Sequence, residues 1–307
     1  MSDDRFGLVM DTRRGWANAD ELQALGARCV RTVVDDFERL ETVLRSHPPE
    51  VRVIATLTAE HLGGGRDPSD LDLWCTTILQ LARRFDGRIW AVECLSAWDQ
   101  HGIEPRVAVE CARRAGRILR DSGSEIACLL GSVAGPEWMQ SLHAAARLLT
   151  AADHDLLAGA GFHPYGKNAR GFPGFGHTRF DHAEIDIAIQ NANDIIQLPI
   201  WATEFGVNLG QAGSESGQAL YVRSAFDLLT GLPSDVLAAA TYFCWWDPIG
   251  APRKDGEYAL GLRRGGDPHG ARAGEPRLAW YAFADVMGGS GVPPATFAPH
   301  PLQTCPR

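Results

Sequence analysis

The most informative stretch of this sequence is Pro199-Ile200-Trp201-Ala202-Thr203-Glu204-Phe205-Gly206, an apolar run that ends in a carboxylate and a glycine. Such a run is typical of a parallel strand that is buried on both faces. In barrels of parallel strands, functional residues stand where the strands end, at the C-terminal face. We therefore expect Glu204 to lie at the rim of a pocket, held by a rigid strand. A helix-capping glutamate after an ordinary strand is the alternative.

Similar apolar runs recur along the chain and alternate with helical segments. With Ile200–Phe205 they make eight expected strands, the others being Phe6–Met10, Cys29–Val34, Val51–Thr56, Ile89–Leu95, Glu125–Leu130, Leu157–His163 and Ala239–Trp245. Helices are expected at Ala19–Leu25, Leu71–Phe85, Pro105–Leu119, Glu137–Thr150, His182–Ile196, Gly217–Thr230 and Arg277–Val286. This alternation implies a parallel sheet with right-handed crossovers.

The predicted fold class is α/β, a single (β/α)8 TIM barrel over residues 1–287, followed by a tail rich in Pro and Gly at 288–307. Eight strands, each followed by a helix, is the number that closes such a barrel. A doubly wound open sheet is the alternative, but that fold places a Gly-rich phosphate turn after its first strand. Residues 11–15 lack this fingerprint, and the glycines at 63–65 lack the Lys-Ser/Thr of a phosphate loop.

Composition limits the classes of partner. The chain of 307 residues has a formal net charge of -9, whereas nucleic-acid and anionic-membrane surfaces attract basic proteins. No apolar stretch is long enough to span a bilayer, and no secretory signal is visible. Seven scattered cysteines without a CxxC motif favour reduced thiols in the cytoplasm. Neither a metal nor a cofactor is expected, since the histidines show no ligand spacing such as HExxH.

Two other predicted strands place polar side chains near the expected pocket. Arg31 lies inside the apolar second strand and needs a carboxylate partner, because a buried charge without one is costly. Glu204 is the leading candidate for that partner, and Glu93 or Asp35 is the alternative. The sixth strand ends in a His-Pro-Tyr segment at residues 163–165, whose hydrogen-bond donors suit the task of orienting a carboxylate.

These strand ends resemble those of the large clan of retaining glycoside hydrolases with (β/α)8 barrels, which includes cellulases, mannanases and xylosidases. The resemblance covers nearly the whole chain. It implies that Glu204 is the nucleophile, that Arg31 is the strand-2 arginine of the clan, and that His163 and Tyr165 face the sugar and the nucleophile. It also implies an aromatic platform for the sugar at the end of the eighth strand.

The eighth predicted strand ends in Phe-Cys-Trp-Trp-Asp-Pro at residues 243–248. Neighbouring residues of a strand point to opposite faces, so one of the two tryptophans belongs to the core. We expect Trp246 to be the sugar platform and Asp247 to contribute to substrate binding.

The fourth strand departs from the clan pattern. The clan carries its acid/base in a segment W-E-x-W-N-E-P-(N/D), and aligning Glu93 with the first Glu places Ser96 at the Asn and Ala97 at the acid/base. A retaining mechanism uses two carboxyl groups about 5–5.5 Å apart, and alanine cannot supply one. Either Asp99 or Glu93 acts as a displaced acid, or the barrel has lost hydrolysis and kept a sugar-like site in which Ser96 contacts the ligand.

The leading functional hypothesis is therefore a glycoside-hydrolase-like protein, of the retaining type if it is active. It would act on a soluble glycoside or a glycosylated small molecule, with Glu204 as nucleophile and a displaced or missing acid/base. One alternative is a non-hydrolytic carbohydrate-binding barrel. The other is a barrel enzyme repurposed for a different small-molecule reaction, with Glu204 as general base. The expected ligand is a small molecule or an oligosaccharide.

Overall fold

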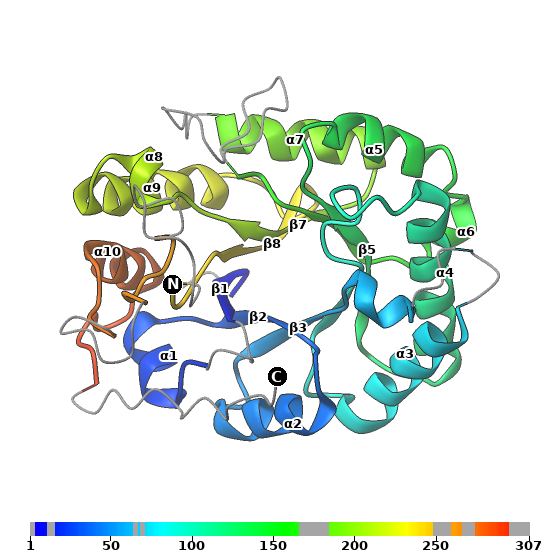
Figure 1. Ribbon diagram of the computed structural model, residues 1–307, viewed down its shortest axis with the longest axis horizontal. Helices are drawn as coiled ribbons and strands as arrows, with labels where there is room; N and C mark the ends of the chain where they lie inside the picture. The colour runs from blue at the N-terminus through cyan, green and yellow to red at the C-terminus, as the bar shows by residue number, and fades with distance from the viewer. Residues whose placement is uncertain are drawn as a thin grey trace.

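The computed structural model describes residues 4–10, 16–63, 67, 71–165, 184–247, 259–265 and 274–294. Its core is a closed barrel of eight parallel strands in sequence order (Figure 1). The strands are β1 (Phe6–Met10), β2 (Cys29–Val33), β3 (Arg52–Thr56), β4 (Ala91–Cys94), β5 (Ala127–Val133), β6 (Gly159–Phe162), β7 (Ile200–Phe205) and β8 (Leu237–Tyr242). The predicted (β/α)8 TIM barrel is confirmed.

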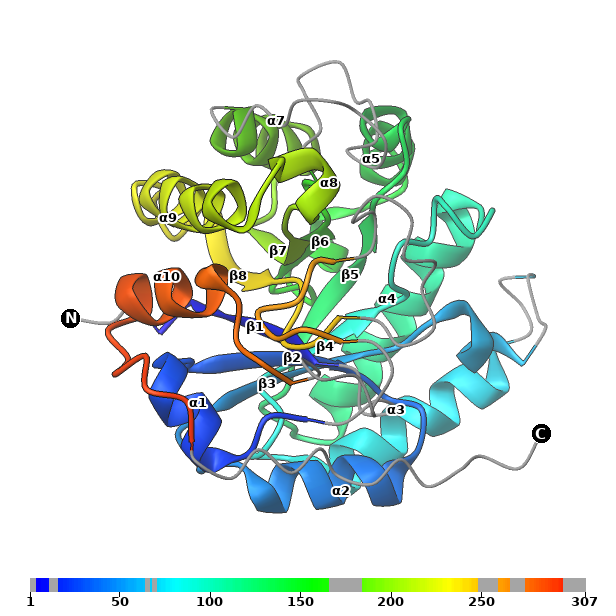
Figure 2. The same ribbon diagram turned by 60° about the vertical axis from the view of Figure 1, so that its left-hand side comes forward.

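Helices surround the barrel, as Figures 1 and 2 show. They are α1 (Ala19–Leu25), α2 (Phe37–Ser46), α3 (Asp72–Phe85), α4 (Pro105–Asp121), α5 (Trp138–Ala146), α6 (Ala151–His154), α7 (Ile185–Ile196), α8 (Leu209–Ala212), α9 (Glu215–Thr230) and α10 (Leu278–Met287), with a 3-10 turn at Ala59–Leu62. The last helix, α10, lies beside the first, α1, so the ring closes on itself.

The N-terminal end of the barrel is filled by large side chains. Trp90 and Trp201 pack with their ring centroids 4.3 Å apart, and the guanidinium of Arg52 lies 4.8 Å from the Trp90 centroid. Around them lies a cluster of buried apolar residues that includes Ile54 and Leu129. This end of the barrel is therefore closed by apolar packing. A polar site has room only at the opposite, C-terminal end of the strands.

Ion pairs hold the described segments that follow β8. Arg277, the residue before α10, pairs with Asp247 and, at 3.3 Å, with Glu215 at the start of α9. Arg263 pairs with Glu21 of α1 at 2.8 Å, and both side chains are buried. The attraction of Arg263 only partly offsets the effect of burial, which raises the pKa of the Glu21 carboxyl. The Arg263–Glu21 pair thus connects the segment after β8 to the first helix.

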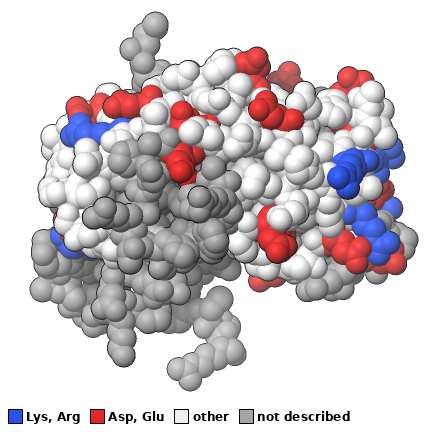
Figure 3. Space-filling view, turned by 90° about the horizontal axis from the view of Figure 1, so that it is seen from above, with Lys and Arg blue, Asp and Glu red and all other residues white. Residues whose placement is uncertain are grey.

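Among the described residues, no helix has both the length and the apolar character needed to cross a membrane. In Figure 3, which is seen from above, acidic side chains are spread over the described surface, and basic ones gather toward its two edges. The expected loop at 166–177, most of the loop at 247–276 and the tail beyond residue 294 lie outside the described residues.

Candidate active site

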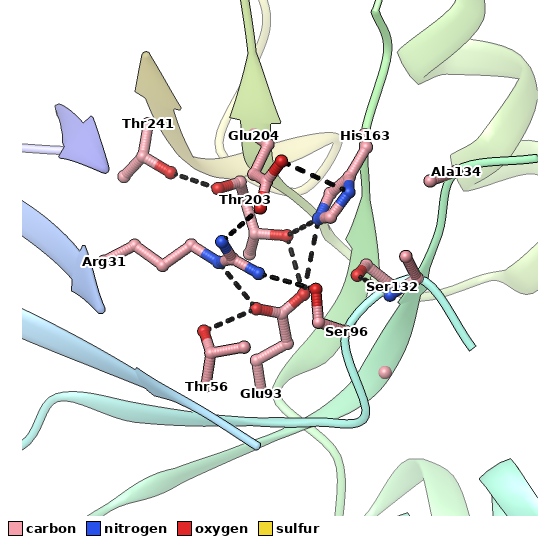
Figure 4. A network of polar contacts seen from close by, with 12 residues as sticks. Arg31, Thr56, Glu93, Ser96, Ser132, Ala134, His163, Thr203, Glu204 and Thr241 are labelled. Carbon is pink, nitrogen blue, oxygen red and sulfur yellow. Dashed lines mark hydrogen bonds and ion pairs between the residues drawn. The ribbon is translucent and has the colours of Figure 1, made fainter. Parts of the chain in front are cut away.

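A cluster of polar side chains occupies the C-terminal end of the barrel around Glu204 (Figure 4). Oε1 of Glu204 lies 2.5 Å from Nη1 of Arg31, and the hydroxyl of Tyr165 donates a hydrogen bond to Oε2. Nδ1 of His163 lies 3.7 Å from the same Oε2. The predicted contact between Arg31 and Glu204 is therefore present, and the His-Pro-Tyr segment meets it from the end of β6.

The parallel strands explain why residues so distant in the sequence meet here. Glu204 is the next-to-last residue of β7, His163 directly follows the end of β6, and Arg31 occupies the middle of β2. Parallel strands in a barrel all end on the same side, so their terminal side chains converge. The long side chain of Arg31 reaches the cluster from lower in the barrel.

Glu93, at the end of β4, lies deeper than Glu204 and is fully buried. Its Oε2 accepts hydrogen bonds from Nε of Arg31 at 2.8 Å and from the Thr56 hydroxyl at 2.7 Å. Its Oε1 accepts from the Thr203 hydroxyl at 2.9 Å. Burial raises the pKa of the Glu93 carboxyl, but Arg31 and His163 overcome this effect and hold the pKa well below its usual range. A carboxylate held ionised in this way does not fit the expected role of a displaced acid.

The contacts of His163 indicate which ring nitrogen carries a hydrogen. Nε2 lies 3.1 Å from the Thr203 hydroxyl, and that hydroxyl gives its own hydrogen to Glu93. The oxygen of Thr203 is then free only to accept, so Nε2 of His163 is the donor. The ring is thereby oriented with Nδ1 toward Glu204. The backbone of Thr203 is fixed as well, because its carbonyl accepts from the Thr241 hydroxyl at 2.5 Å.

Glu204 differs from Glu93 in being accessible, since its side chain is 16% exposed. Burial raises the pKa of its carboxyl, but His163, Arg31 and the hydrogen bond from Tyr165 outweigh that effect and lower the pKa below its ordinary value. Burial and the neighbouring Glu204 raise the pKa of the Tyr165 phenol well above its ordinary value, so it remains a hydrogen-bond donor. The site therefore presents one ionised, oriented and reachable carboxylate.

The segment after β4 carries an unusual backbone. Leu95 and Ala97 have φ angles of 72° and 48°, in the left-handed region that residues with a Cβ atom rarely adopt. Between them, the hydroxyl of Ser96 accepts a hydrogen bond from Nη2 of Arg31 at 2.9 Å. The amide of Ala97 donates to the Ser132 hydroxyl at 2.9 Å. The segment thus places Ser96 beside Arg31 and fixes the backbone of Ala97 against β5.

Asp99 is bound to a neighbouring loop. Its Oδ1 accepts from the amide of Ala134 at 2.8 Å, and its Oδ2 accepts from the amide of Gly135 at 2.7 Å. The amide of Gln100 donates to Oδ1 as well. Both oxygens therefore hold the backbone after β5. These contacts do not fit the expectation that Asp99 swings into the site as a displaced acid.

Asp247 and Trp246 lie on the segment after β8. Both oxygens of Asp247 accept backbone hydrogen bonds, from Gly261 at 2.7 Å and Gly265 at 3.0 Å, and Arg277 pairs with the same carboxylate. Asp247 thus fixes the segment, a role that the expectation of substrate binding did not foresee. Trp246 is half-buried, and its ring centroid lies 5.6 Å from that of Trp245.

Phe243 is an aromatic residue of the site that the sequence interpretation overlooked. It directly follows β8, its side chain is half-buried, and its ring meets that of Tyr165 edge to face with centroids 6.1 Å apart. Tyr165 in turn donates to Glu204, so Phe243 is linked to the candidate nucleophile through a single intervening side chain. Its position directly before the two tryptophans, at the end of β8, is the signal in the sequence that could have indicated it.

No group of three or more potential metal ligands occurs among the described residues. The described cluster holds one cation, Arg31, between Glu93 and Glu204.

Solved structures share this fold at low sequence identity. A β-glucuronidase from Ruminococcus gnavus matches 92% of the chain at 14% identity, with a TM-score of 0.60. A GH5_18 protein from Bifidobacterium longum subsp. infantis matches 94% of it at 13% identity, with a TM-score of 0.64 and 79% of that chain covered. A β-glucosidase from Exiguobacterium marinum matches 92% at 10% identity, with a TM-score of 0.59 and 98% covered.

The chain spans about half the length of the β-glucuronidase, 48% of which is covered. No protein-family model and no curated protein matches the sequence. These structural neighbours are O-glycosyl hydrolases built on a barrel of eight parallel strands, and at such low identity the likeness shows the fold alone.

Proposed function

We propose that this protein acts on glycosides, with Glu204 as the nucleophile of a retaining mechanism. The observation that carries the proposal is the setting of Glu204 at the end of β7, where Arg31, Tyr165 and His163 converge on one carboxylate. A carboxylate nucleophile must be ionised, oriented and open to the anomeric carbon. The lowered pKa, the three partners and the partial exposure of Glu204 meet these needs.

The neighbouring side chains have roles that follow from their chemistry. Arg31 and Tyr165 hold the two oxygens of Glu204, so attack occurs from a fixed direction. Ser96 offers a hydroxyl beside this pair, suited to a sugar hydroxyl. Phe243 and Trp246 supply half-buried aromatic surface, the kind of surface on which the apolar face of a sugar ring packs.

A mechanism-based label tests the proposal directly. We would incubate the protein with a panel of 2-deoxy-2-fluoro glycosides that carry a dinitrophenyl leaving group, and look by peptide mass spectrometry for a sugar bound to Glu204. Glu204→Gln should abolish labelling, whereas Asp99→Asn, a carboxylate-to-amide change at a loop anchor, should leave it intact. Labelling of a different carboxylate, or of none across the panel, would refute the role of Glu204.

A non-hydrolytic carbohydrate-binding barrel is the second candidate, and the state of Glu93 and Asp99 favours it. Both carboxylates are occupied by cations, hydroxyls or backbone amides, so neither is available to exchange a proton with a leaving group. This candidate predicts binding of glycans without turnover and without labelling. A third, in which Glu204 acts as a general base, is less favoured, because an efficient base has a pKa near the working pH and that of Glu204 is lowered.

A further inference from the structure

The hydroxyl of Thr203 lies between Glu93 and His163 (Figure 4). It donates to Oε1 of Glu93 at 2.9 Å, and its oxygen lies 3.1 Å from Nε2 of His163. The same Oε1 and Nε2 are 3.6 Å apart, which is too long for a direct hydrogen bond. All three side chains are buried. Thr203 is therefore the link through which the buried carboxylate acts on the imidazole ring.

Thr203 and Glu204 are consecutive residues of β7, and consecutive strand residues ordinarily point to opposite faces. Here both side chains reach the same cluster. The pairing of β7 with β8 shifts its register between Ala202 and Phe205, and such irregularities redirect side chains next to active sites. The Thr241 hydroxyl donates to the carbonyl of Thr203 and holds the backbone at this point. The two neighbours therefore belong to one network.

Glu93 sets the direction of the hydrogen bonds in this network. Burial raises the pKa of its carboxyl, but Arg31 outweighs that effect and keeps the group ionised, so it can only accept. A hydroxyl has one hydrogen, which Thr203 gives to Glu93, and its oxygen then accepts from Nε2 of His163. A neutral ring with its hydrogen on Nε2 has a lone pair on Nδ1. That lone pair faces Oε2 of Glu204 across 3.7 Å.

A lone pair at this position keeps Glu204 reactive. Arg31 and Tyr165 already bind one oxygen each, so they fix the orientation of the carboxylate. A further donor at Nδ1 of His163 would stabilise the ionised form without improving that orientation. This stabilisation would be lost as the carboxylate bonds to the anomeric carbon, and an interaction that is stronger in the ground state than in the transition state slows the reaction.

We propose that Thr203 is a positioning residue whose hydroxyl keeps the hydrogen of His163 on Nε2, so that the ring presents an acceptor rather than a donor to Glu204. The effect on rate rests on the proposed function. The position of the hydrogen does not, because it can be measured on the free protein.

Three variants isolate the hydroxyl of Thr203. Thr203→Val removes it with little change of shape, and Thr203→Ser keeps it. Thr56→Val is the matched control, because the Thr56 hydroxyl also donates to Glu93, at 2.7 Å, from the neighbouring strand β3. The two valine variants each remove one hydroxyl from the same buried carboxylate, so their melting temperatures should fall alike. Only Thr203→Val removes the group that binds the ring.

Long-range ¹H–¹⁵N NMR spectra of the intact chain at neutral pH report which ring nitrogen carries the hydrogen. The signals of His163 are identified by their loss in His163→Asn. We expect the hydrogen on Nε2 in the parent, in Thr203→Ser and in Thr56→Val. In Thr203→Val we expect it on Nδ1, because Nε2 then faces a methyl group while Nδ1 faces Glu204.

The rate on nitrophenyl glycosides gives the second readout. Thr203→Val should lower kcat about 10–100-fold, the factor that corresponds to a hydrogen bond with a charged group. Thr203→Ser should restore most of the activity, and Thr56→Val should lose far less than Thr203→Val. If Thr203→Val fails to fold, Thr203→Ala, which also lacks the hydroxyl, replaces it.

The outcomes separate the inference from the proposed function. A parent ring with its hydrogen on Nδ1, or with hydrogens on both nitrogens, would overturn the inference, and so would an unchanged ring in Thr203→Val. If Glu204 is labelled and Thr203→Val keeps the parental kcat, or loses no more than Thr56→Val, the proposed function stands and the inference is wrong. If no glycoside labels Glu204, both are wrong.

Discussion

Glu93 and Glu204 share one guanidinium: Nε of Arg31 binds Glu93 at 2.8 Å, and Nη1 of the same residue binds Glu204 at 2.5 Å. The two carboxylates have different surroundings. Glu93 is fully buried and receives hydroxyls as well, whereas Glu204 is partly exposed. Glu93 therefore fixes Arg31 in place, and Arg31 then presents its outer edge to Glu204. One arginine connects the buried Glu93 to the orientation of the exposed carboxylate, Glu204.

Glu93→Gln should destabilise the protein strongly. Removing one partner of a buried ion pair leaves an uncompensated charge, which costs about 3–5 kcal/mol. Glu204→Gln is the matched control and should cost less, because its side chain reaches solvent and Arg31 keeps Glu93. Urea unfolding followed by circular dichroism measures both free energies. An equal loss for the two variants would contradict the division of roles.

The same pair predicts how stability depends on pH. The folded-state pKa of Glu93 lies well below the ordinary value of 4.5, so its contribution to stability is complete above that value and is lost as pH falls toward the lower folded pKa. The free energy of unfolding should therefore decline below about pH 4.5, and more gently in Glu93→Gln. Parallel pH profiles of the two proteins would overturn this prediction.

Tyr165→Phe should reduce activity without reducing stability much. The change removes the hydrogen bond to Glu204, and such bonds to charged groups contribute about 1.5–3 kcal/mol. We expect kcat/KM on nitrophenyl glycosides to fall about 10–100-fold. The acid limb of the pH–rate profile should also move upward, because the pKa of Glu204 loses one of the influences that lower it. An unmoved acid limb would mean that the phenol does not act through Glu204.

Asp99→Asn should affect folding rather than chemistry. An amide cannot accept at both of its polar atoms, so the amide of Ala134 or Gly135 loses its partner at a cost of about 1–3 kcal/mol. Asp86→Asn is the control, since exposed Asp86 uses one oxygen for its contacts and should tolerate the change. Melting temperatures and the ratio of rates on good and poor leaving groups give the readout. A changed ratio in Asp99→Asn would restore Asp99 as an acid.

Phe243→Ala should weaken ligand binding more than Trp246→Ala does. Phe243 contacts Tyr165, whereas Trp246 packs on Trp245. Truncating the former removes surface beside Glu204, and truncating the latter removes packing after β8. Calorimetric titration with the sugar that labels Glu204, together with melting curves, separates the two effects. The reverse ranking of affinities would make Trp246 the sugar platform, as the sequence suggested.

The barrel could be predicted from the sequence because buried parallel strands leave a strong pattern. Apolar runs located all eight strands, and Phe6–Met10 and Ile200–Phe205 have the predicted bounds. The helix Phe37–Ser46 was not predicted, although its buried Leu40, Val43 and Leu44 have the i, i+3, i+4 spacing of one helix face. The expected helix 137–150 ends at Ala146 because the chain turns there before Thr150 caps a new short helix.

Site residues could be predicted where the strand that carries them marks them out, but the contacts they make with distant segments could not. Glu204 and Arg31 lie in strands, and His163 and Tyr165 follow the end of β6, so their convergence follows from the fold. The fate of Glu93 could not be predicted, because the hydroxyls that saturate it come from β3 and β7 and nothing in its own segment identifies them. Asp99 likewise binds amides of a distant loop, whose backbone direction no local pattern specifies.

The buried pair of Glu21 and Arg263 has a consequence for how the protein is made. Glu21 belongs to the first helix, and Arg263 emerges from the ribosome only after the eighth strand. A nascent chain that stops short of Arg263 can bury Glu21 of α1 only without the cation that pairs with it in the complete barrel. Strand β1 also pairs with β8, so we expect the barrel to close only after the residues around Arg263 have been synthesised. C-terminal truncation before this arginine should yield a chain that chaperones retain.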